Sequence, residues 1–296
     1  MTVNTTKNIG LHPVYMVLCE QHEQGPQFQD LSPEDLRAAT NDMALSLMPK
    51  LPEVHQKVWK ITVADREVTI LVLRPLGTEN ELCVRSKMAV VFVEYNLAPE
   101  VKFPIAHEEC YAALEWLVNN HESVKVNPDK IAIMGDSGGA HMAAGLSTIS
   151  KQRGLDVIKA QALVYPAVAP HREHLESWKL YGSGEYVLTH KEANYFMDSY
   201  FPKHPSEYQD VLATPSIASK EELASLPPTL IITAECDILR DEGEAYARQI
   251  TEAGADATAI RIVGTMHGFF AHPMETPQYN LAVGLIVDHV VRSFSQ

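Results

Sequence analysis

The stretch Lys130-Ile-Ala-Ile-Met-Gly-Asp-Ser-Gly-Gly-Ala-His141 joins an apolar run to a helix-like segment through a glycine-rich turn. Within it, Gly135-Asp-Ser-Gly-Gly139 has the G-x-S-x-G spacing of a sharp strand-to-helix turn, on which a serine Oγ is lifted above a sheet. An ordinary glycine-rich turn is the alternative interpretation, because the pattern also occurs by chance. The strand before and the helix after favour a nucleophile at Ser137, with the N–H of Gly138 pointing where an oxyanion would form.

Short apolar runs alternate with helix-like segments on both sides of this turn. The runs lie at 68–73, 88–93, 131–134, 162–165, 229–233 and 258–263. Their continuous β-branched character is typical of strands that are buried on both faces. Amphipathic helices are predicted at about 105–121, 138–152, 242–253 and 279–294, with Glu108 and Glu109 on the solvent side of the first. This alternation predicts an α/β fold in which helices flank a mostly parallel central sheet.

Two stretches do not follow the alternation. The first contains a helix that begins at Ser32 as N-cap, with Pro33 at its first position. The second, about 170–225, contains a helix capped by Thr189 and Glu192, and a long insertion after a strand often covers a site. We therefore expect residues 1–54 to form an N-terminal cap segment. Residues 55–296 are expected to form the catalytic domain, with a helical cap inserted at about 170–225.

A serine nucleophile needs a base, and the base needs an acid that orients it, each on a loop after a later strand. Asp237 follows the run 229–233 and is the predicted acid. Asp241 is read as structural, since it begins the next helix with Glu244 three residues on, and Glu235 is a weaker rival because it still falls on the strand. His267 follows the last predicted strand, between two glycines, and is the predicted base.

Composition excludes several classes of partner. The 296 residues are 46% hydrophobic and 21% charged, with a net charge of −14, which is unsuited to binding nucleic acid or an anionic membrane by charge. The N-terminus has neither a signal-peptide cleavage site nor an apolar run long enough to span a bilayer. Four cysteines without C-x-x-C spacing predict neither a disulfide framework nor a zinc site, so we expect a cytoplasmic location. We also expect no metal, because Asp42, Asp136 and Asp210 have no His or Cys nearby at ligand spacing.

Four motifs in this order resemble those of the hormone-sensitive-lipase-like carboxylesterases, family IV of the α/β-hydrolase fold. They are Tyr95-Asn-Leu-Ala-Pro-Glu100, Gly135-Asp-Ser-Gly-Gly139, Asp237-Ile-Leu-Arg-Asp-Glu-Gly243 and His267-Gly-Phe269. The resemblance extends over most of the chain from about residue 55, and Asn96 stands where many relatives carry arginine. It implies hydrolysis of short to medium acyl esters through a Ser-His-Asp triad and an acyl-enzyme, without a cofactor.

The largest departure from this family lies between Pro75 and Met88. The family has there a further strand, a His-Gly-Gly-Gly loop and a helix, whereas residues 76–87 are polar and too short for them. No His-Gly-Gly occurs within 60–130. The sequence therefore identifies one donor to the oxyanion, the backbone N–H of Gly138, and we expect the oxyanion hole to be incomplete. In addition, residues 131–134 either pair directly with 88–93 or leave a central sheet edge open.

Several functions stay open from sequence alone. The chain is read first as a serine carboxylesterase acting on a small-molecule ester. The alternative is an inactive or weakly active relative, a deletion or splice variant, that binds a small apolar ligand without efficient turnover. The same triad also serves peptidases and amidases, and a ligand receptor can be built on this fold. Acyl chain length and oligomeric state, a homodimer included, are not decided by the sequence.

Overall fold

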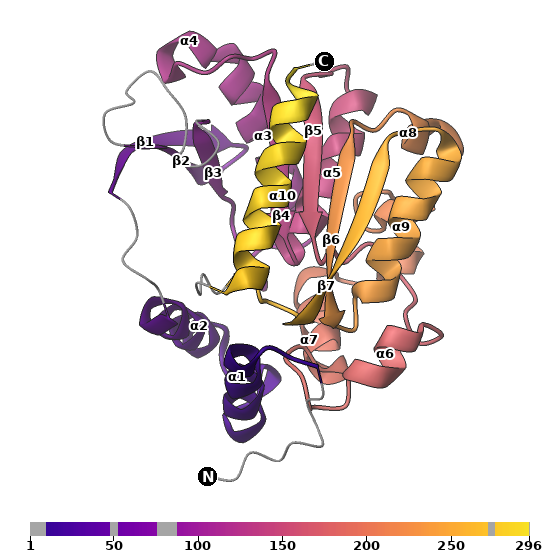
Figure 1. Ribbon diagram of the computed structural model, residues 1–296. Coiled ribbons are helices and arrows are strands. Elements are labelled where there is room, and N and C mark those ends of the chain that lie inside the picture. The colour runs from indigo at the N-terminus through magenta and orange to yellow at the C-terminus, as the bar shows by residue number, and fades with distance from the viewer. Residues whose placement is uncertain (1–9, 48–52, 76–87, 272–275, 296) are drawn as a thin grey trace.

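Two sheets organise the chain in the computed structural model, which describes residues 10–47, 53–75, 88–271 and 276–295 (Figure 1). The first sheet is antiparallel, in the order β1 (Val54–Val63), β2 (Arg66–Pro75) and β3 (Val90–Glu94). The second is parallel, in the order β4 (Ile131–Asp136), β5 (Ile158–Val164), β6 (Thr229–Cys236) and β7 (Ala257–Met266). The predicted α/β architecture with a parallel sheet is confirmed, whereas the strand β1 has no counterpart among the predicted runs.

Helices cover both faces of the parallel sheet, which explains its continuous apolar strands. On β6, Leu230 and Ile232 belong to one buried cluster with α10 (Pro277–Ser293), and Ile231 between them belongs to another with α9 (Arg240–Ala253). Successive strand residues point to opposite faces, so each face is buried in turn. The second cluster also includes α5 (Gly138–Gln152), which spans the predicted residues 138–152.

Most of the remaining helices lie beside the antiparallel sheet or around the carboxyl ends of the parallel strands (Figure 1). The remaining helices are α1 (Pro13–Gln24), α2 (Pro33–Leu47), α3 (Ile105–Asn119), α4 (His121–Val124), α6 (Glu176–Tyr181), α7 (His190–Tyr200) and α8 (Lys220–Ala224), with 3-10 turns at Phe28–Asp30, Pro205–Glu207 and Pro215–Ile217. Helix α8 differs from the others, since it packs beside α9 at the end where β6 begins. In Figure 1 the parallel strands run downward, and α6 and α7 lie below their lower ends. Among the helices that the structure describes, none has the length and apolar character needed to cross a membrane.

Helices from the two stretches outside the alternation contact each other. His22 Nε2 on α1 lies 3.1 Å from a carboxylate oxygen of Glu192 on α7, and both side chains are buried. The predicted caps of α2 and α7 are present, with Ser32 Oγ accepting from Asp35 N and Thr189 forming a capping box with Glu192. This contact joins α1 to α7, since separating the helices would remove one hydrogen-bond partner of a buried carboxylate that also accepts from Thr189.

The two sheets are not hydrogen-bonded to each other within the described part of the chain. β3 pairs with β2 and β4 pairs with β5, so the direct pairing of 131–134 with 88–93 is wrong. The alternative, a β4 edge that pairs with no other strand, holds among the described residues. Phe92 on β3 and Met134 on β4 are 54% and 50% exposed. The prediction about residues 76–87 lies outside the described residues.

Glu109 is a second correction to the sequence-based expectations. Its side chain on α3 is fully buried rather than on the solvent side. It accepts hydrogen bonds from the backbone N–H and the side-chain amide of Asn96, at 2.8 and 2.9 Å, and from Arg66 Nε at 3.2 Å. Asn96, the residue that departs from the family motif, therefore has a defined structural partner.

Candidate active site

The turn between β4 and α5 holds Ser137 in a strained backbone conformation, with φ +50° and ψ −119°. Non-glycine residues seldom adopt such values, and they concentrate at functional sites. Gly135 is required by contact: a Cβ there would lie 2.2 Å from the carbonyl carbon of Gly139. A Cβ on Gly139 would meet no described atom within 4 Å apart from its chain neighbours and its own helix backbone, so of these two glycines only the first is required by a steric contact.

Three side chains from different strand ends meet at this turn. Ser137 Oγ lies 2.9 Å from His267 Nε2, and His267 Nδ1 lies 2.8 Å from Asp237 Oδ2. Asp237 follows β6 and His267 follows β7, at the edge where the carboxyl ends of parallel strands come together. Asp237 and His267 are buried, whereas Ser137 is half-buried. The structure thus brings together all three residues that the sequence singled out.

The Asp237 carboxylate is held from both sides. While Oδ2 faces His267, Oδ1 accepts a hydrogen bond from the backbone N–H of Leu239 at 2.9 Å. The rival Glu235 lies on β6 and accepts from the backbone N–H of Gly264 at 2.7 Å. Glu235 therefore fixes the end of β7 and has no hydrogen bond with the histidine.

Asp241 contributes to packing in a way that differs from the prediction. α9 begins at Arg240, and its N-cap, Leu239, makes no side-chain capping bond. Asp241 instead accepts from the backbone N–H of Ser177 at 2.7 Å and from Arg240 Nε at 2.8 Å. The predicted cap arrangement of Asp241 with Glu244 is wrong, and Asp241 joins α6 to α9.

The N-terminus of α5 lies directly beside the serine. α5 begins at Gly138, and the first amide groups of a helix lack intrahelical acceptors and carry partial positive charge. Such N–H groups favour negative charge that develops on an oxygen next to Ser137. Among the described residues, no group of three or more His, Cys, Asp and Glu side chains is placed to hold a metal ion.

One residue at the site was missed by the sequence analysis. Tyr165 directly follows β5, and its ring centroid lies 4.6 Å from that of His267. Its place was a weak signal, because Tyr165 ends the predicted run 162–165 and the carboxyl end of a parallel strand lies at the same sheet edge as Ser137 and His267. Nothing in the local sequence distinguishes such a tyrosine from a core residue.

Known proteins share this architecture. A family model described as having the alpha/beta hydrolase fold matches residues 77–271. The chain is 28% identical to an arylesterase of Saccharolobus solfataricus over 284 residues, which cover 88% of this chain and 91% of the relative. A protein of Acanthamoeba polyphaga mimivirus, described as an α/β hydrolase, is 27% identical over 314 residues, covering 95% of this chain and 88% of the relative.

Similarity to solved structures extends over nearly the whole molecule. An esterase structure from the fungus Rhizomucor miehei superposes with a TM-score of 0.92 at 36% identity, covering 97% of this chain and 99% of that chain. The region matched by the family model, residues 77–271, contains all four motifs, at residues 95–100, 135–139, 237–243 and 267–269, and the fungal esterase has the same fold. The chain belongs to the hormone-sensitive-lipase-like esterases, family IV of the α/β-hydrolase fold.

Proposed function

We propose that the chain is a serine carboxylesterase that hydrolyses small-molecule esters with short to medium acyl groups. The observation that carries the proposal is the continuous hydrogen-bonded series Ser137–His267–Asp237 at the carboxyl edge of the parallel sheet. Both distances lie within the range of about 2.6–3.2 Å for a hydrogen bond between a nucleophile and its base, or between that base and the acid that orients it. The esterase names of relatives support an ester rather than an amide substrate.

The proposed reaction proceeds through an acyl-enzyme. His267 Nε2 accepts the Ser137 proton while Oγ bonds to the ester carbonyl carbon, and the Asp237 carboxylate stabilises the imidazolium through Nδ1–H. Collapse of the tetrahedral intermediate breaks the bond to the alcohol oxygen, which receives the proton from His267. Water then attacks the acyl-Ser137 carbonyl while His267 takes its proton. Collapse of this second intermediate breaks the bond between the acyl carbon and Ser137 Oγ, Oγ receives the proton from His267, and the acid product leaves.

We also propose that turnover is slower than in a family member with a His-Gly-Gly-Gly loop. Gly138 N–H is the donor identified for the oxyanion, and no His-Gly-Gly occurs in residues 60–130. The match with the mimivirus protein spans 314 positions, more than the 296 residues of this chain, so the relative contains residues without a counterpart here. Loss of one oxyanion donor lowers kcat by roughly 10²–10³-fold in other enzymes.

Hydrolysis of p-nitrophenyl acetate and butyrate by the purified protein tests both proposals. Wild type should release p-nitrophenol and Ser137→Ala should not. A matched control is Ser147→Ala on the helix that follows Ser137, since Ser147 Oγ donates to Gln161 and lies in the core. Activity that survives Ser137→Ala would refute the nucleophile assignment.

The size of the rate separates the two remaining interpretations. Serine-dependent turnover at the level of active esterases would show that other groups complete the oxyanion hole. Folded, soluble protein without turnover would favour the weakly active relative that binds a small apolar ligand. Mass spectrometry after treatment with a fluorophosphonate shows whether Ser137 is reactive at all, independently of deacylation.

A further inference from the structure

Tyr165 connects the turn that carries the serine to the loop that carries the histidine. We propose that Tyr165 is a positioning residue, whose hydroxyl couples Asp136 to Ala271 and whose ring supports His267. The inference rests on the proposed esterase function and deepens it, because it explains how the loop that carries Ser137 and the loop that carries His267 keep a fixed position relative to each other.

The hydroxyl of Tyr165 makes a hydrogen bond in each direction. It donates to Asp136 Oδ2 at 3.1 Å, and Asp136 immediately precedes Ser137. It accepts from the backbone N–H of Ala271, also at 3.1 Å, four residues after His267. Burial, followed by the neighbouring Asp136 carboxylate, raises the pKa of Tyr165 well above its ordinary value. The group therefore stays protonated and keeps both hydrogen bonds across the working range of an esterase.

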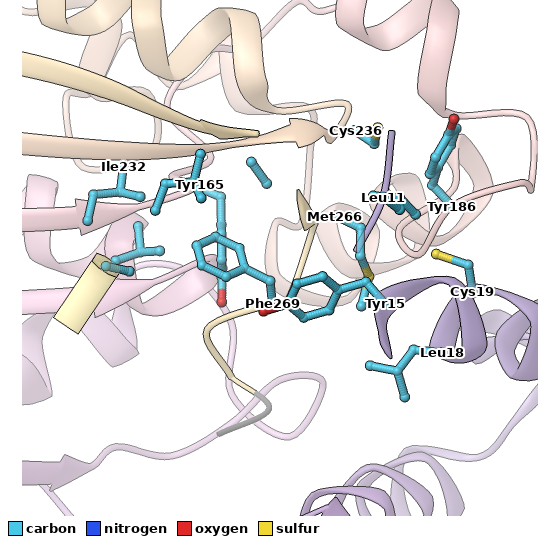
Figure 2. Close-up of a cluster of buried hydrophobic side chains, with 14 of the residues drawn as sticks. Leu11, Tyr15, Leu18, Cys19, Tyr165, Tyr186, Ile232, Cys236, Met266 and Phe269 are labelled. Atoms are coloured by element: carbon cyan, nitrogen blue, oxygen red, sulfur yellow. The ribbon is translucent and has the colours of Figure 1, made fainter. Parts of the chain in front are cut away.

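The ring of Tyr165 packs against two rings of the histidine loop, those of His267 and Phe269. Its centroid lies 4.6 Å from that of His267 and 5.6 Å from that of Phe269. The tyrosine is fully buried, and Figure 2 shows its side chain beside Phe269, within the cluster that also contains Tyr15. Contact on this face restricts rotation and sliding of the imidazole relative to Ser137.

The backbone at Tyr165 is also held in an unusual conformation and contacts the serine turn. Its φ is +37°, a value that non-glycine residues seldom adopt, so the surrounding contacts must hold it. The residue before it, Val164, accepts the backbone N–H of Ser137 at 2.9 Å, and Tyr165 N–H donates to Ile232 O at 2.7 Å. The end of β5 therefore contacts the serine turn through both its backbone and the tyrosine side chain.

Loss of the hydroxyl frees the two loops to shift independently. Catalysis depends steeply on the Ser137–His267 geometry, since a displacement of about 1 Å lowers the rate by roughly 10²-fold. Tyr165→Phe keeps the ring and removes only the hydroxyl. We expect kcat to fall between about tenfold and about hundredfold, with KM changed by less than about twofold.

Tyr15→Phe is the matched control. Tyr15 is fully buried in the same cluster, packs edge-on against Phe269, and its hydroxyl bonds to Thr276 Oγ1 at 2.6 Å. Both variants lose one buried hydroxyl, so both should lower the melting temperature. Tyr165→Phe should lower it more, because within the described part of the chain its hydroxyl makes two hydrogen bonds and that of Tyr15 makes one. Only Tyr165→Phe should lower kcat. Equal kcat values in the two variants would assign Tyr165 a purely structural role and overturn the inference.

A double-mutant cycle tests whether Tyr165 acts through Asp136. Asp136→Ala removes the acceptor, so adding Tyr165→Phe to it should lower kcat by much less than Tyr165→Phe does alone. Fully additive effects would refute the coupling. The ¹⁵N resonances of the His267 imidazole, assigned with His267→Gln, provide a readout without turnover. These resonances should shift in Tyr165→Phe and not in Tyr15→Phe. An unchanged His267 spectrum in Tyr165→Phe would refute the inference, whether or not the wild type is active. Inactivity of the wild type, by itself, would count only against the proposed esterase function.

Discussion

Replacing Arg172 by methionine is expected to lower the free energy of unfolding by about 3–5 kcal/mol, because it leaves a buried carboxylate without its counter-charge. Arg172 lies at the start of the segment that follows β5, and Glu242 lies on α9. Their side chains are 7% and 0% exposed, and Arg172 Nε donates to Glu242 Oε2. Glu242 Oε1 also accepts the backbone N–H groups of Val168 and Ala169, at 2.6 and 3.1 Å.

The pH dependence of the variant follows from the same carboxylate. Burial raises the pKa of Glu242, and Arg172 opposes that rise through its charge and its hydrogen bond. Without the arginine the pKa rises further. A carboxyl group whose pKa is raised on folding favours the folded state at low pH and loses that contribution as pH rises through the folded pKa. The destabilisation by Arg172→Met should therefore be largest at neutral pH and smaller in acid.

Urea unfolding followed by tryptophan fluorescence measures the effect, with Arg153→Met as the matched control. Arg153 makes a two-bond pair with Glu108 at 2.7 Å, but these side chains are 38% and 40% exposed, so its loss should change stability by less than about 1 kcal/mol. For a chain of this length, 3–5 kcal/mol corresponds to a decrease in Tm of about 5–8 °C. The double variant with Glu242→Gln should recover much of the loss, because glutamine carries no charge and keeps an acceptor oxygen for the backbone N–H groups of Val168 and Ala169. Equal effects of Arg172→Met and Arg153→Met would refute the reasoning.

Three further predictions concern the site and its surroundings. Asp237→Asn should lower kcat by about 10⁴-fold in steady-state assays, with KM little changed, because an amide favours the wrong imidazole tautomer of His267; a loss below tenfold would contradict this. Gly135→Ala should give little soluble protein, since its Cβ would lie 2.2 Å from the carbonyl carbon of Gly139, whereas Gly139→Ala should fold normally. Burial lowers the pKa of His141 to about 4. Unfolded histidine takes up its proton near pH 6.5, so unfolding free energy should fall as pH drops from about 6.5 toward 4, and His141→Asn should flatten that slope in urea titrations.

Local patterns in the sequence determined the strands of the parallel sheet and the order of the site residues. Continuous apolar runs predict buried strands, and a glycine-flanked serine after one of them predicts the sharp turn at Ser137. Chain order then pointed to Asp237 and His267, which the structure places in hydrogen-bond contact. These inferences succeeded because periodicity and turn chemistry involve residues that are close in sequence.

Contacts between distant parts of the chain were decided only by the tertiary structure. The polar residue Glu109 is buried because Asn96 and Arg66 supply donors from other elements. Likewise, Asp241 bonds to Ser177 rather than capping its own helix. Tyr165 resembles any core tyrosine until folding places its hydroxyl between two loops. Burial of a polar group depends on partners that arrive from elsewhere in the chain, and no local pattern of residues specifies them.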